Sequence, residues 1–64
     1  MKYYMIIESK NGEFIEGTYY RLEDALKRRD DELYYIKRDK RSGERAFVVE
    51  ADAYDSGNYS EVLE

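Results

Sequence analysis

The sequence predicts an α+β fold of β-β-α-β-β order, in which a four-stranded antiparallel sheet carries one helix on one face. Three observations predict this fold class: two stretches in which apolar runs flank a glycine-containing turn, and between them a segment with the spacing of an amphipathic helix. A chain of 64 residues is long enough for one domain, which we place at residues 1–51, with residues 52–64 as an acidic C-terminal tail.

The first hairpin is predicted from residues 2–8, a nearly continuous row of tyrosine, methionine and isoleucine that is typical of a strand buried on both faces. Asn11 and Gly12 follow, a pair that favours a tight hairpin turn. A three-residue loop at residues 10–12 keeps apolar side chains on one face, whereas a two-residue Asn-Gly turn would place Ile7 opposite a glutamate. We therefore expect the longer loop, with the pairs Tyr3 and Tyr19, Met5 and Gly17, and Ile7 and Ile15.

A short helix is predicted over residues 21–31, where Leu22, Ala25 and Leu26 recur at helical spacing. Acidic residues begin this segment and basic residues end it, which is the arrangement that the helix dipole favours. Such a helix, about three turns long with a narrow apolar stripe, can cover one face of a sheet but would hardly be stable alone.

A second hairpin is predicted from residues 33–37 and 46–49, which are rich in aromatic and β-branched residues. A charged stretch containing Gly43 separates them, and a three-residue loop there sets opposite charges against each other across the strands. The charged pairs are Lys40 and Glu44, and Asp39 and Arg45. The expected core beneath the helix comprises Met5, Ile7, Ile15, Leu22, Leu26, Leu33, Tyr35, Phe47 and Val49.

Catalysis is not expected, because the chain has no histidine and no cysteine, which often serve as base, nucleophile or metal ligand near neutral pH. The densest acidic cluster, residues 30–32, ends the predicted helix and is typical of a solvated turn. We therefore expect no enzyme activity, no cofactor and no metal. No apolar run could cross a bilayer and the N-terminus lacks the form of a signal peptide, so we expect a cytoplasmic location.

Paired tyrosines are the most distinctive feature of the sequence, at residues 3–4, 19–20 and 34–35. Because neighbouring strand residues point to opposite faces, one ring of each pair should lie in the core and the other on the far face of the sheet. An aromatic patch with an acidic rim is typical of protein interfaces. The residues that we assign to a partner-binding site are Tyr4, Ile6, Phe14, Tyr20, Tyr34, Glu50, Asp52 and Asp55.

Two interpretations of this far face stay open at the level of sequence. It is an interface with another protein chain, either a second copy in a homo-oligomer such as a homodimer or a separate target. Alternatively, the C-terminal tail folds back over it through Tyr54, Tyr59, Val62 and Leu63. An oligomer whose tyrosines line a pocket between copies, acting as a small-molecule sponge, is a further hypothesis.

Nucleic-acid binding is the alternative function, because aromatic residues alternate with basic ones on or beside the second hairpin, as in proteins that bind single strands. These basic residues are Lys37, Arg38, Lys40, Arg41 and Arg45. The net charge of −4 and the carboxylates among these residues oppose this hypothesis. We therefore expect weak or no binding to nucleic acid at physiological salt.

In length, acidity, tyrosine content and lack of catalytic groups, the chain resembles small phage-encoded accessory proteins, including the anti-CRISPR inhibitors. The resemblance implies a viral protein that inhibits a host defence protein by stoichiometric binding in the host cytoplasm, with carboxylates in place of nucleic-acid phosphates. Its candidate mimics are Glu50, Asp52, Asp55, Glu61 and Glu64, with Asp30, Asp31 and Glu32. The sequence thus favours a non-enzymatic protein-binding module.

Overall fold

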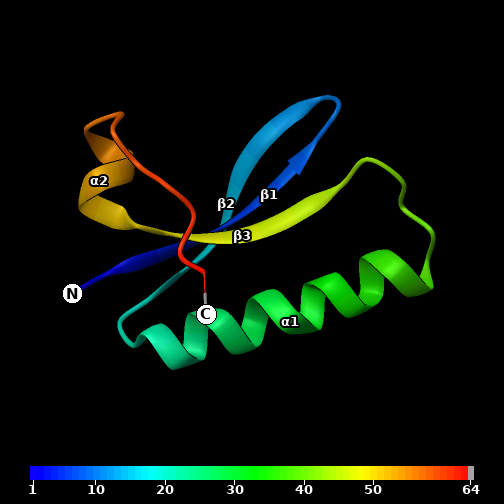
Figure 1. The fold of residues 1–64 in the computed structure, drawn as a ribbon, viewed down its shortest axis with the longest axis horizontal. Coiled ribbons are helices and arrows are strands. Elements are labelled where there is room, and N and C mark those ends of the chain that lie inside the picture. The colour runs from blue at the N-terminus through cyan, green and yellow to red at the C-terminus, as the bar shows by residue number, and fades with distance from the viewer. Residues whose placement is uncertain (64) are drawn as a thin grey trace.

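A computed structural model describes residues 1–63 and shows a three-stranded antiparallel sheet with the strand order β2-β1-β3. Figure 1 shows the long helix α1 running along one face of the sheet and the short helix α2 lying toward the other, while the C-terminal segment runs from α2 past β3 toward α1. The predicted α+β class is confirmed, but the four-stranded sheet of β-β-α-β-β order is wrong. The elements are β1 (Tyr3–Ser9), β2 (Gly12–Tyr19), α1 (Leu22–Arg38), β3 (Arg45–Glu50) and α2 (Ala51–Asp55).

The first hairpin exists, but its register changes halfway along. The predicted pairs Tyr3 with Tyr19 and Met5 with Gly17 are confirmed. Beyond them, an extra residue in β2, Glu16, forms a β-bulge, so that Ile7 lies opposite Phe14. The predicted three-residue loop and the pair of Ile7 with Ile15 are therefore wrong. Ser9 pairs with Gly12 across a two-residue turn, and Ile15 pairs with Ile6 on the face away from α1.

The second hairpin does not exist, because residues 33–37 belong to α1. The expected cross-strand pairs of residues 39 and 40 with residues 45 and 44 are absent for the same reason, since residues 39–44 form the loop after the helix. The helical spacing of Leu22, Ala25 and Leu26 continues through Leu33 and Ile36, and the sequence contains no glycine or proline between residues 17 and 43 to interrupt it. The β preference of tyrosine, which is weak and depends on context, does not outweigh that periodicity.

The sheet is buried on both faces, so the core has two parts. On the α1 side, Met5, Ile7, Ala25, Ala46 and Val48 are buried, with Leu22, Leu26, Ile36 and Val62 packed against them. On the α2 side, Ile6, Phe47 and Val49 are buried beneath Tyr4 and Tyr54. Each part removes apolar surface from water, which matters in a chain this small.

The predicted core is correct for β1 and wrong for several residues elsewhere. Phe47 and Val49 lie on the α2 side because β1 pairs with β3 in the register of Met5 with Val48. Leu33 and Tyr35 are 41% exposed, since they lie on α1 rather than in a central strand. Ile15 is 42% exposed as a result of the bulge.

The C-terminal segment is the element that completes the fold. The Val62 backbone N–H donates a 2.7 Å hydrogen bond to the Val48 carbonyl, and Arg45 binds the Glu61 carboxylate at 2.7 Å. The predicted fold-back over the far face holds for Tyr54, which packs with Tyr4 over Ile6, and for Tyr59, which contacts Tyr54. Val62 packs on the α1 side instead, and Leu63 is exposed. None of the helices within residues 1–63 is both long enough and apolar enough to span a membrane.

Candidate protein-binding surface

Tyrosine rings and carboxylates gather where α2 and the C-terminal segment meet the sheet. We call this group the acidic–tyrosine surface, and it consists of Tyr4, Tyr54, Tyr59, Glu13, Asp52 and Asp55. The alternation of β1 directs Tyr4 to this face, and the single turn of α2 brings Tyr54 across it. The side chains therefore come from four separate parts of the chain.

Hydrogen bonds and ring contacts hold the tyrosines of the acidic–tyrosine surface in place. The Tyr4 hydroxyl donates to the two carboxylate oxygens of Asp55 at 3.2 and 3.1 Å, and the Tyr54 hydroxyl donates to Glu13 Oε2 at 2.9 Å. The Tyr4 and Tyr54 rings meet edge to face at 5.6 Å between centroids, and Tyr59 lies 4.8 Å from Tyr54. Such edge-to-face packing is the arrangement that aromatic quadrupoles favour.

The local field is negative at two of these hydroxyls. Burial and then the neighbouring Asp55 carboxylate raise the pKa of Tyr4, and the hydrogen bond to Glu13 is the main cause that raises the pKa of Tyr54. Lys2 lies 5.8 Å from the Tyr4 ring centroid and partly opposes the shift in the pKa of Tyr4. The hydroxyls therefore stay protonated and act as donors to carboxylates that carry the negative charge.

Glu13 is the member that sequence reasoning missed. It lies opposite Glu8 across the hairpin, and two like charges in direct cross-strand contact destabilise a sheet. The structure relieves this repulsion from two sides, because Arg45 binds Glu8 at 3.1 Å and Tyr54 donates to Glu13. The only signal in the sequence was the register of the first hairpin, which the bulge altered.

The other residues assigned to the partner-binding site do not join this surface. Ile6 is fully buried, and Glu50 pairs opposite Tyr3 at the end of β3. Three exposed aromatic residues lie on separate parts of the chain, Phe14 on β2, Tyr20 before α1 and Tyr34 on α1. Of the residues assigned from the sequence, Tyr4, Asp52 and Asp55 are brought together, while the candidate mimic Glu64 lies outside the described residues.

The basic residues of the nucleic-acid alternative are largely engaged in ion pairs. Arg38 binds Asp39 at 3.1 Å, Arg41 binds Glu32 at 2.8 Å, and Arg45 binds both Glu8 and Glu61. Within residues 1–63, only the lysines of the set, Lys37 and Lys40, have no ion pair. A phosphate backbone would have to displace carboxylates from the arginines, so the structure offers this alternative little support.

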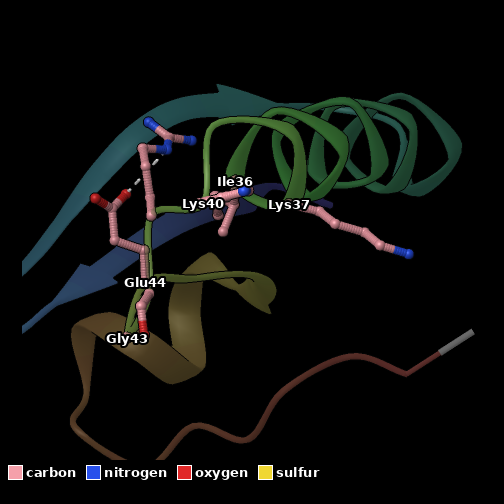
Figure 2. A pocket seen from close by; sticks show the side chains of 7 residues that line it. Ile36, Lys37, Lys40, Gly43 and Glu44 are labelled. Atoms are coloured by element: carbon pink, nitrogen blue, oxygen red, sulfur yellow. Dashed lines mark ion pairs between the residues drawn. The ribbon is translucent and has the colours of Figure 1, made fainter.

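A shallow pocket of about 320 Å³ lies at the C-terminal end of α1 and the loop that follows (Figure 2). Its wall is formed by Ile36, Lys37, Lys40, Arg41, Ser42, Gly43 and Glu44. Glu44 lies 3.6 Å from Arg41 Nε and offsets its charge, and Figure 2 shows the Lys37 side chain pointing away from the pocket. The helix carbonyls at this end also oppose a bound anion, so the pocket offers no convergent set of polar groups.

Within residues 1–63, no group of three or more His, Cys, Asp or Glu side chains is placed to hold a metal ion. Comparison of the chain with protein-family models, with curated proteins and with solved structures finds no match. Function is therefore inferred from the chain's own residues.

Proposed function

We propose that this protein is a non-enzymatic binding module that engages a basic segment of another protein through the acidic–tyrosine surface. The observation that supports it is the placement of Glu13, Asp52 and Asp55 around Tyr54 and the two tyrosines whose rings contact it, Tyr4 and Tyr59. No lysine or arginine occurs in residues 46–64, and Lys2 lies 5.8 Å from the Tyr4 ring centroid at the side of this surface. Tyrosine-rich patches with a charged rim are what protein interfaces favour.

The physical basis of recognition is electrostatic complementarity combined with rigid aromatic contacts. The hydroxyls of Tyr4 and Tyr54 are already bound to carboxylates, so little side-chain entropy is lost when a partner docks. A basic partner gains long-range attraction to the carboxylates, which speeds association and weakens as salt rises. The chain resembles small phage-encoded inhibitors, and this resemblance suggests one class of partner. That partner is a host defence protein whose phosphate-binding site the carboxylates would occupy.

The test uses a fluorescein-labelled octa-arginine peptide as the probe, with binding measured by fluorescence anisotropy between 50 and 300 mM salt, a range of roughly twofold in Debye length. We expect Asp52→Asn with Asp55→Asn to weaken binding about tenfold, which corresponds to about 1.4 kcal/mol. Asparagine at position 55 can still accept the Tyr4 hydrogen bond, so the fold should persist.

The matched control for the octa-arginine test is Asp24→Asn with Asp31→Asn. It changes the net charge equally, but both carboxylates are exposed on α1, away from the acidic–tyrosine surface. We expect less than about a twofold effect, because distant exposed charges are screened at these salt concentrations. Equal losses in the two double variants would show that the peptide responds to net charge alone and would contradict the proposal.

A further inference from the structure

The sheet has two edge strands, and they differ in what covers them. On β3, the C-terminal segment supplies a backbone hydrogen bond from Val62 to Val48 and an ion pair from Glu61 to Arg45. On β2, no residue makes a backbone–backbone hydrogen bond beyond those of its ladder with β1, within residues 1–63; the Gly12 carbonyl accepts from the Ser9 hydroxyl at 3.5 Å, at the turn. In an antiparallel strand alternate N–H and C=O groups point away from the neighbour, so β2 presents an open edge.

The open edge of β2 lacks most of the devices that usually prevent strand pairing. The strand Gly12–Tyr19 contains no lysine, arginine or proline. The bulge at Glu16 distorts only its second half, which leaves residues 12–15 in regular register with β1. In this half Phe14 is 59% exposed and Ile15 42% exposed, and as neighbours they project to opposite faces of the sheet.

We propose that residues 12–15 of β2 are a docking edge on which a basic, extended segment of another protein adds as a fourth strand. This inference rests on the proposed function, because Glu13 of the acidic–tyrosine surface lies in the same half-strand. A lysine of the added strand, on the same face as Glu13, would meet that carboxylate, while the strand's apolar side chains on the other face would cover Phe14.

The charges of β2 favour a basic segment of another protein, rather than a second copy of this chain, as the added strand. Two β2 strands paired with each other would bring together two copies each of Glu13 and Glu16, with no basic residue from either strand. Arg28 compensates Glu16 at 2.8 Å, whereas among residues 1–63 the partner of Glu13 is the neutral Tyr54 hydroxyl. A lysine-bearing strand removes this repulsion and adds attraction.

The test uses a labelled heptapeptide of alternating lysine and valine in three forms: unmodified, N-methylated at every valine, and N-methylated at every lysine. Valine and lysine N–H groups point to opposite edges of the extended peptide, so each modification removes the donors of one edge and keeps the charge. Strand addition with the lysines on the Glu13 side predicts at least tenfold weaker binding for one N-methylated form and less than threefold for the other.

A matched pair of protein variants locates the edge. Phe14→Lys and Tyr34→Lys each replace an aromatic residue, 59% and 63% exposed respectively, and change the net charge equally. With folding checked by circular dichroism, we expect Phe14→Lys to weaken binding of the unmodified peptide at least tenfold and Tyr34→Lys less than threefold.

The outcomes separate this inference from the proposed function. If both N-methylated forms bind like the unmodified peptide and the binding falls with salt, the docking edge is overturned while the acidic binding surface stands. If octa-arginine binds but the unmodified lysine–valine peptide does not, the docking edge fails and the proposed function stands; if neither peptide binds, both fail. Sedimentation of the protein alone adds a third result: a dimer that Phe14→Lys abolishes and Tyr34→Lys preserves would assign the edge to a second copy instead.

Discussion

Lys40 has a φ of 55°, a left-handed backbone conformation that residues other than glycine rarely adopt. It ends α1, where its N–H donates to the Lys37 carbonyl at 3.3 Å and the Arg41 N–H donates to the Ile36 carbonyl at 3.0 Å. This pair of bonds is the Schellman motif, and glycine is the usual residue at this position. The sequence predicted a strand position here, with Lys40 opposite Glu44 in a second hairpin, because a lysine does not mark the end of a helix as glycine does.

Lys40→Gly should therefore stabilise the protein by about 0.5–1 kcal/mol, because glycine adopts the left-handed conformation without strain. Urea unfolding should show a higher midpoint with an unchanged slope. Lys37→Gly, three residues earlier in the last turn of α1, provides the control and should cost up to about 1 kcal/mol of helix propensity. Destabilisation by Lys40→Gly would mean that this residue does not end the helix as described.

At the scale of elements, α1 is held to the rest of the molecule by a chain of ion pairs as well as by its apolar stripe. Arg28 on α1 binds Glu16 in the bulge of β2 at 2.8 Å. Glu32 binds Arg28 at 3.3 Å and Arg41 at 2.8 Å, and Arg41 lies 3.6 Å from Glu44. The bulge thus has a structural role, because it turns the extra glutamate of β2 toward the helix. None of this was predicted, since it depends on the bulge and on the full length of α1.

Glu32→Gln should destabilise the protein by about 1–2 kcal/mol, because two charge-assisted contacts weaken at a side chain that is only 14% exposed. The comparison is Glu23→Gln, whose ion pair with Arg21 is solvent-exposed and should contribute less than about 0.5 kcal/mol. Chemical denaturation of both variants measures the difference. Equal small losses would show that the ion pairs of Glu32 with Arg28 and Arg41 do not stabilise α1 and the loop that follows it.

At the scale of the whole molecule, the C-terminal segment makes a three-stranded sheet sufficient for so short a chain. One helix could bury only one face of β1, and the other face carries Ile6 at the centre of the second apolar group. Tyr54 of α2 covers that face and contacts Tyr59, whereas Val62 binds the β3 edge and packs on the α1 side. The segment from α2 to Tyr59 thus both covers the core and contributes to the candidate binding surface.

Tyr4→Glu tests this covering directly, because a carboxylate there would face Asp55 and lose the ring contact with Tyr54. We expect a loss of about 2 kcal/mol, the scale of an uncompensated charge at a packed site. Tyr20→Glu is the matched control at a 74% exposed site and should change stability by less than about 0.5 kcal/mol. Unfolding curves of the two variants measure the difference in stability. Similar losses would mean that α2 does not pack on Tyr4.

The sequence by itself determined features that depend on local order: the first hairpin's outer pairs, the start of α1, and a central strand apolar on both faces. It also singled out Tyr4, Asp52 and Asp55. Only the tertiary structure decided that residues 33–37 are helical, because their tyrosines suit a strand while their spacing suits a helix. It likewise decided which face Phe47 takes and what covers Tyr4, since strand register and long-range packing arise from contacts between segments far apart in the chain.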